Sequence, residues 1–138
     1  MKRLLSTGLL VISIALSTQA SEPEVIEAAR GETVAWLTLT DTGQYESSWD
    51  SASALFKAAI SKEDWDKSLS AVRNPIGALE SREIAAAEFT TTLPGAPDGE
   101  YVVFQFNSSF EHKATALETV TAMKDADGAW RVAGYFIK

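Results

Sequence analysis

The sequence predicts an α+β fold in which N-terminal helices pack against a curved four-stranded antiparallel sheet. Apolar residues recur every three or four positions in the first half of the chain, as on one face of a helix. In the second half, apolar and polar residues alternate, which is typical of strands with one buried face. Because a sheet with one apolar face needs a cover, we expect the helices to lie on that face.

The first twenty residues have the three parts of a secretory signal peptide. Lys2 and Arg3 form a positive start, residues 4–16 are mostly apolar, and small residues lead up to Ala20. We expect cleavage after Ala20 and a periplasmic or secreted protein. A membrane anchor is the alternative, but the apolar run is shorter than the roughly 20 residues that span a bilayer. No stable membrane anchor is therefore expected after cleavage.

Residues 21–138 are expected to form a single α+β domain. The chain has 19 acidic and 12 basic residues and a formal charge of −7, which argues against nucleic acid as a partner. It has no cysteine and one histidine, His112. Thiolate chemistry and multi-histidine metal sites are therefore excluded, and we expect no cofactor and no metal.

The helical half is expected to run from Ser21 to Arg73. Ser21 precedes an acidic first turn with an early proline, which is typical of a helix start. Gly43 is expected to end this first helix.

Two further helices are expected before the sheet. Thr42 is expected to cap a second helix, whose apolar stripe extends over residues 45–60. Ser61 opens a third helix, with Asp64 three residues later as in a capping box. The segment 74–77, Asn-Pro-Ile-Gly, ends the helical half, because proline disfavours a helical residue before it.

Four strands follow in an antiparallel meander, and Asp127-Gly128 marks the last hairpin turn. In the final strand, Trp130, Val132 and Phe136 are expected on one face, and Arg131 and Tyr135 on the other. In the second strand, Val102, Phe104, Phe106 and Phe110 are expected to face the core. The four predicted strands are 84–93, 101–110, 114–124 and 130–137.

The most specific motifs in residues 21–138 are Trp36-Leu37-x-Leu39-x-Asp41-x-Gly43-x-Tyr45-x-x-Ser48-Trp49 and Asp127-Gly128-x-Trp130-Arg131-Val132-x-Gly134-Tyr135. Together with weaker motifs between them, they resemble domain-of-unknown-function family 4019, a group of small exported bacterial proteins. The likeness covers nearly all of residues 21–138, and it implies no catalytic residues. The pattern also looks like nuclear transport factor 2-like folds, in which a curved sheet and helices form a cone with an apolar pocket.

Five residues are candidates for ligand binding: Trp36, Tyr45, Arg73, Arg82 and Tyr135. The aromatic residues could line a pocket, but large aromatics at helical spacing are more often core. The arginines could hold an anion. The alternative, which we favour, is that they pair with neighbouring acids, among them Asp41, Glu80, Glu83 and Glu118.

Asp41, Glu118 and Tyr135 form the one candidate set for general acid–base catalysis. For Asp41, capping at the helix break is the more ordinary role. For Glu118, the ordinary partner is an arginine on a neighbouring strand. An acid–base site is therefore the less favoured interpretation.

The most favoured function is a non-catalytic module that binds an unknown small molecule or protein. A small cofactor-free enzyme of the cone-shaped fold, isomerase- or dehydratase-like, is the first alternative. An assembly factor that forms a homodimer through its sheet is the second. An enzyme needs a carboxylate and a tyrosine without an arginine that neutralises the acid. Small-molecule binding needs an enclosed apolar cavity of about 300 Å³ or more, and assembly needs an apolar outer sheet face or a bare edge strand.

Overall fold

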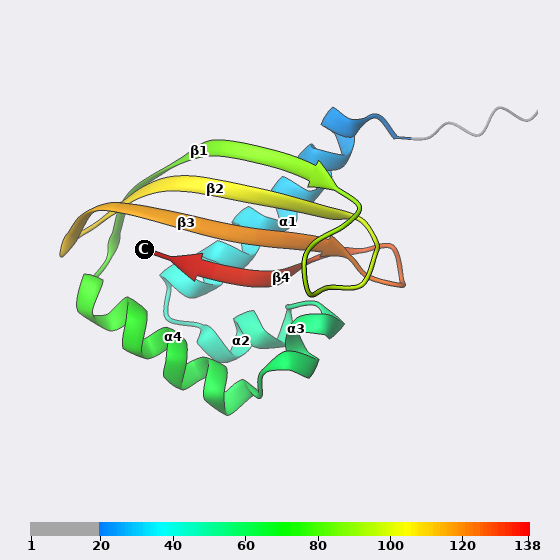
Figure 1. Cartoon of the computed structure of the whole chain (residues 1–138). Helices are drawn as coiled ribbons and strands as arrows, with labels where there is room; N and C mark the ends of the chain where they lie inside the picture. Colours follow the sequence, from blue (N-terminus) through cyan, green and yellow to red (C-terminus); the bar gives the residue numbers. More distant parts are fainter. Residues whose placement is uncertain (1–19) are drawn as a thin grey trace, which may run out of the picture.

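The computed structural model describes residues 20–138, and it confirms the predicted α+β class (Figure 1). The four strands pair antiparallel in chain order, β1-β2-β3-β4. None of the helices in this part of the chain is long and apolar enough to span a membrane. The helices are α1 (Glu22–Asp41), α2 (Tyr45–Asp50), α3 (Ala54–Ala59) and α4 (Lys62–Ile76), and the strands are β1 (Leu79–Thr90), β2 (Tyr101–Phe110), β3 (Lys113–Lys124) and β4 (Trp130–Ile137).

The curved sheet lies over α1, which contacts all four strands (Figure 1). Helix α2 packs between α1 and α4, and α3 contacts β4. The predicted signal peptide lies outside the described residues except for Ala20, so it stays a prediction. Helix α1 begins at Glu22, directly after Ser21, and the chain reverses beyond its end at Gly43, which has a φ of +75°.

The predicted second helix was wrong, because two short helices replace it. The break lies at Ser53, whose hydroxyl accepts a hydrogen bond from the Phe56 N–H at 3.1 Å. The Ser53 N–H donates to the Val132 carbonyl of β4 at 2.8 Å. A cap and a contact with the sheet therefore interrupt the helix. Thr42 does not cap α2 either: it ends α1, and its hydroxyl donates to the Thr38 carbonyl at 2.8 Å.

Helix α4 begins as predicted, with the Ser61 hydroxyl accepting from the Asp64 N–H. Its predicted end at Arg73 was wrong, since the helix continues through Pro75 to Ile76. Pro75 has no N–H to donate to the carbonyl of residue 71, and the helix ends one residue after it. The Ile76 carbonyl accepts from the His112 N–H at 2.8 Å, which holds this turn against the β2–β3 hairpin.

Strands β2 and β4 have the predicted bounds, and β3 begins one residue earlier than predicted. The prediction for β1 was wrong at both ends: it begins at Leu79 rather than Ile84, and it ends at Thr90 rather than Leu93. The early part of β1 carries polar residues, which hid the strand signal. It nevertheless pairs with β2, and the first pair is Leu79 with Phe110. The inward alternation of β2 is confirmed, and Ser108 joins its buried face.

The predicted facing of β4 was wrong after Val132. The register between β3 and β4 shifts there, because Ala122 pairs with Val132 while Thr121 pairs with Gly134. This β-bulge at Ala133 exchanges the two faces beyond it. Tyr135 therefore points to the core, and Phe136 is 61% exposed.

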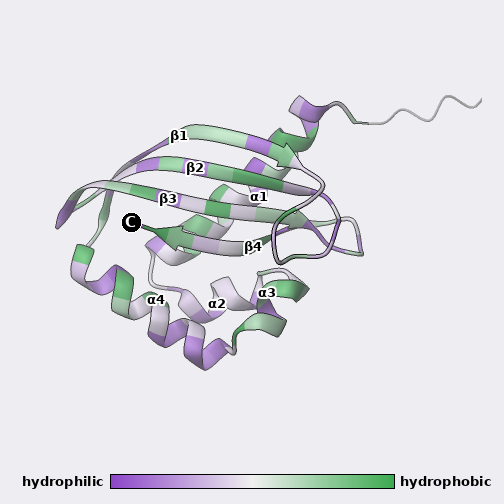
Figure 2. Cartoon of the chain, in the orientation of Figure 1, coloured by the Kyte–Doolittle hydropathy of each residue, from purple (hydrophilic) through white to green (hydrophobic). Residues whose placement is uncertain are grey.

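The core lies between the concave face of the sheet and the helices. Hydrophobic segments lie along β2, β3 and α1 (Figure 2). Trp36 and Trp65 are buried, and their indole N–H groups donate to the carbonyl and the hydroxyl of Ser48, at 2.8 and 2.9 Å. Trp49 is half-buried and packs against the same cluster. The cluster's largest buried members are Trp36, Leu37, Phe56, Trp65, Phe104, Phe106 and Trp130.

Candidate functional site

A buried polar network lies at the end of the concave face where α1 and α4 end. Asp41 is the last residue of α1, and Arg73 is in the last turn of α4. Arg82 of β1 and Glu118 of β3 lie on the same face of the sheet. Ile84 and Glu118 both pair with Phe106 of β2, and Arg82 precedes Ile84 by two residues and so shares its face. Four elements that are distant in sequence therefore bring two arginines and two acids together.

Arg82 connects the two acids. Its Nε donates to Glu118 Oε1 at 2.8 Å, and its Nη1 and Nη2 donate to the two carboxylate oxygens of Asp41 at 2.7 and 2.9 Å. Such two-pronged pairs are the strongest form of side-chain ion pair. Both carboxylates raise the pKa of Arg82 against the opposing effect of burial, so it stays charged.

Glu118 is 0% exposed, and both of its carboxylate oxygens accept hydrogen bonds from side chains. Besides two bonds from Arg82, it accepts from the Ser108 hydroxyl at 2.5 Å and from the Tyr135 hydroxyl. A carboxylate has about four acceptor sites, and these bonds occupy them. Burial, and then the charge and hydrogen bond of Glu118, raise the pKa of Tyr135, although Arg73 and Arg82 oppose the shift. The phenol therefore stays protonated.

Arg73 completes the network and is only 4% exposed. Its Nη1 donates to Thr40 Oγ1 at 3.1 Å, and its Nη2 donates to Asp41 Oδ1 at 2.8 Å. Its guanidinium lies 4.8 Å from the ring centroid of Phe110. A carboxylate at a helix C-terminus is disfavoured by the helix dipole, and the two arginines offset that cost at Asp41.

The network is balanced, with two positive and two negative groups. The prediction that Asp41 caps a helix was wrong, because its carboxylate binds the two arginines instead. The favoured alternative for Arg73 and Arg82, pairing with Asp41 and Glu118, is confirmed. The geometry leaves the arginines no uncompensated charge for an anion and leaves Glu118 no free oxygen for a substrate proton.

Four of the five predicted ligand residues line hollows, but not the same hollow, and Arg82 lines none of the three. The rings of Trp36 and Tyr135 lie 5.6 Å apart, and Tyr135 reaches Arg82 through Glu118. Tyr45 and Arg73 line a polar hollow of about 260 Å³ beside Gly43. Tyr135 lines a second hollow of about 230 Å³ between α4 and β4, whereas Trp36 lines a third, between α1 and β4.

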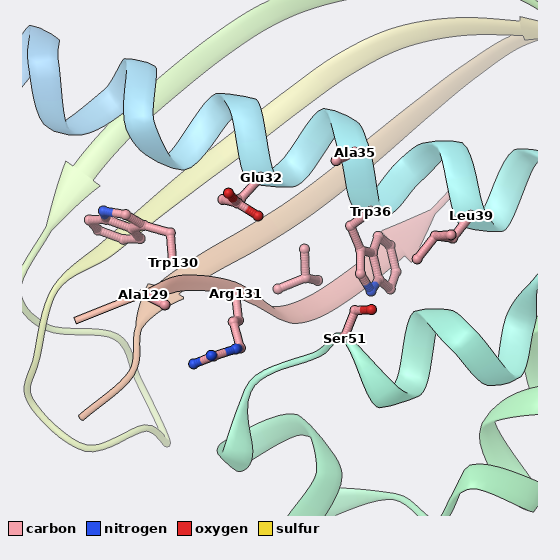
Figure 3. A pocket seen from close by; sticks show the side chains of 9 residues that line it. Glu32, Ala35, Trp36, Leu39, Ser51, Ala129, Trp130 and Arg131 are labelled. Atoms are coloured by element: carbon pink, nitrogen blue, oxygen red, sulfur yellow. The ribbon is translucent and has the colours of Figure 1, made fainter. Parts of the chain in front are cut away.

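This third hollow is an open groove of about 470 Å³ (Figure 3). Trp36 and Trp130 line it from α1 and β4, and Ser51 lies at one end. The prediction included only Trp36 among these residues. Glu32, Ala35 and Leu39 recur at helical spacing beside Trp36, which is the signal for a second, outward-facing stripe on α1. Reading a single apolar stripe on this helix missed it.

The charges at the groove are unequal. Arg131 donates to Asp125 at 2.9 Å and to both carboxylate oxygens of Asp127 at 2.9 and 2.8 Å. The hydrogen bond from Arg131, and then that from the Ala129 N–H, lower the pKa of Asp127 to about 2. Glu32, on the opposite wall, has no ion-pair or hydrogen-bond partner among residues 20–138. Arg131 is thus fully paired, and Glu32 is the acid of the groove lining that has no partner in this part of the chain.

Residues 20–138 hold no group of three His, Cys, Asp or Glu side chains placed to bind a metal ion. A family model for proteins of unknown function, DUF4019, matches residues 32–135. The chain belongs to the DUF4019 family. The match begins at Glu32 and ends at Tyr135, so the DUF4019 region includes both the groove and the polar network. No curated protein matches the chain. The resemblance to this family is thereby confirmed, whereas the likeness to nuclear transport factor 2-like folds stays a prediction.

Proposed function

We propose that this DUF4019 protein is a non-catalytic binding module, and that its ligand lies in the groove between α1 and β4. The observation that carries the proposal is the groove itself, with a volume of about 470 Å³ and two tryptophans in its lining. Ligand sites commonly have volumes of about 300–1,000 Å³ and combine aromatic walls with a few polar groups. The groove has this combination, although it is open rather than enclosed.

The two tryptophans give the groove a rigid apolar lining. Trp36 is 3% exposed and Trp130 is 8% exposed, so each presents only an edge or part of a face to the hollow. Ala35 is small and leaves space on the α1 wall. The groove is preformed, and a ligand would bury apolar surface there with little reorganisation of the protein.

The polar network supports the non-catalytic part of the proposal. Glu118 and Tyr135 do meet, but Arg82 neutralises the carboxylate, and four donors surround it. The predicted signal peptide supports a place of action outside the cytoplasm. Binding in the periplasm or outside the cell is therefore part of the proposal.

The homodimer alternative has one observation in its favour. Strand β1 is an edge of the sheet, and Ile84 on it is 42% exposed. The strand also has a register shift between Ile84 and Ala86 and exposed glutamates at 80, 83 and 88. Bulges and charges are features that prevent edge pairing, so the groove is the better supported site.

Native mass spectrometry of the protein purified from the cells that produce it tests the proposal. Ala35→Phe fills the groove, and Ala28→Phe places the same ring on an exposed position of α1 that does not line it. A bound species should remain on the wild type and on Ala28→Phe and be absent from Ala35→Phe. Equal retention by Ala35→Phe, with its folding shown by circular dichroism, would refute the groove as the site.

A further inference from the structure

We infer that the groove between α1 and β4 selects a ligand with an ammonium group and an apolar body, with the ammonium beside Glu32 and between Trp36 and Trp130. This inference rests on the proposed function and adds the chemical class of the ligand. Figure 3 shows Glu32 projecting from α1 into the space between the two indoles.

The charge of the rim favours a cation. Arg131 is the basic residue that lines the groove, and Asp125 and Asp127 both bind it. These two acids do not line the groove, but they compensate the positive charge of Arg131. Glu32 lines the groove with a negative charge that no cation among residues 20–138 neutralises. An anionic ligand would therefore meet a paired arginine and an unpaired glutamate, whereas an ammonium would complete an ion pair with Glu32.

The indoles favour the same group. An ammonium is attracted to the negative face of an aromatic ring within about 6 Å, and tryptophan is the best of the aromatic residues for this contact. Trp36 and Trp130 lie on either side of Glu32 along the groove (Figure 3). Neither has a lysine or arginine over its ring in the described part of the chain.

The molecule already holds an ammonium in this way at another place. The Lys62 ammonium lies 2.7 Å from a carboxylate oxygen of Asp50 and 5.3 Å from the ring centroid of Trp49. An acid and an indole thus surround a side-chain ammonium on this protein. The groove offers one acid and two indoles, but residues 20–138 supply no ammonium to them.

Three other hollows lack this combination. The hollow at the start of α1 is lined by Glu22, and by Glu100 paired with Lys124, but by no tryptophan. The polar hollow beside Tyr45 contains Arg73 and Asp41, whose charges cancel. The hollow between α4 and β4 is lined by Val72 and Phe136 but by no charged side chain. Cation selectivity is therefore specific to the groove, which makes it testable against the rest of the surface.

Choline and its neutral tert-butyl isostere are a matched pair of probes, because they differ in charge and scarcely in shape. Heteronuclear NMR of the indole N–H groups would follow each titration, with Trp49 as an internal control outside the groove. We expect choline to shift the signals of Trp36 and Trp130 and to bind about three to ten times more tightly than the isostere.

Glu32→Gln should remove most of this difference and leave the binding of the isostere unchanged. Glu24→Gln, an exposed acid on α1 outside the groove, is the control and should bind both probes like the wild type. Equal affinities for the two probes, no effect of Glu32→Gln, or shifts that spare Trp36 and Trp130 would each overturn the inference. The proposed function would still stand if a native ligand were lost from Ala35→Phe.

Discussion

Two buried regions share the concave face of the sheet, and they are stabilised in opposite ways. The apolar cluster around Phe104 lies near the middle, and the polar network around Glu118 lies at one end. Both of these side chains are fully buried. In the cluster, each residue contributes many weak contacts. In the network, each charge is tolerated only because its partner is present.

The difference shows what each region does for the fold. The cluster would tolerate exchange among apolar side chains of similar volume, since its contacts have no fixed partners. The network connects Asp41, Arg73, Arg82 and Glu118 through bonds with defined directions. It therefore fixes where the ends of α1 and α4 lie on the sheet, whereas the cluster provides most of the free energy of burial.

The largest expected effect comes from the cluster. Phe104→Ala should lower the free energy of unfolding by about 3–5 kcal/mol, because it removes a fully buried ring and leaves a cavity. Phe136→Ala is the matched control, as this ring lies on the same sheet but is mostly exposed, and it should cost less than about 0.5 kcal/mol. Urea unfolding measures both. Similar losses would contradict the facing that the β4 bulge gives to Phe136.

Removing one charge from the network should lower the free energy of unfolding almost as much. Glu118→Gln should cost about 3 kcal/mol, because Arg82 loses a buried partner and the new amide places a donor among donors. Asp41 still pairs with Arg82, which keeps the cost near the lower end of the range for buried pairs.

A second substitution separates the two regions. Adding Arg82→Met to Glu118→Gln removes the excess positive charge and leaves Asp41 paired with Arg73, so the double variant should regain about 1–2 kcal/mol relative to additivity. Phe104→Ala with Phe136→Ala, whose ring lies on the opposite face of the sheet, should be additive. A double-mutant cycle from urea unfolding gives both values, and simple additivity at Arg82 and Glu118 would mean that the network is not coupled.

The apolar region was the more predictable from sequence. Alternation alone placed Phe104 and Phe106 inward and gave the bounds of β2, because periodicity is a local property. The bulge at Ala133 is one extra residue, and no local signal distinguishes it from continued alternation. That one residue exchanged the predicted faces of Tyr135 and Phe136.

The polar region was predictable only as a set of alternatives. Four acids could pair with Arg73 and Arg82, and the two that do, Asp41 and Glu118, were among them. The choice depends on the register of β1 against β2 and on where α1 ends, which are long-range properties. The groove was missed for the same reason. Trp36 and Trp130 line one groove only after the β3–β4 hairpin folds against α1.

The pH dependence of stability distinguishes the regions next, because the network contains Tyr135, a partly buried tyrosine whose pKa is raised. Burial and Glu118 hold the pKa of Tyr135 above its ordinary value of about 10. Below pH 10 both the folded and the unfolded chain keep this proton, so the stabilisation is complete. Above it the unfolded chain loses the proton first, and the stability should fall by about 1.4 kcal/mol per pH unit.

Tyr135→Phe removes this titration and shares every other tyrosine and lysine with the wild type. Its deficit in unfolding free energy relative to the wild type should therefore shrink as the pH rises from 9 to 11. Urea unfolding at several pH values measures the difference. A constant gap would show that Tyr135 has no raised pKa in the folded state.

The smallest effect concerns an exception within the apolar region. Thr33 of α1 is fully buried among apolar neighbours, and its hydroxyl has no hydrogen-bond partner within the described chain. A buried polar group without a partner costs about 1–3 kcal/mol, and valine has nearly the same shape. Thr33→Val should therefore raise the free energy of unfolding by about 1 kcal/mol, after the small helix-propensity difference.

Thr40→Val, at the border of the network, should instead destabilise, because Arg73 would lose the acceptor of its Nη1 group. If both variants destabilised the fold in urea, Thr33 would have a hidden partner, and the boundary between the two regions would lie further along α1 than the hydrogen bonds indicate.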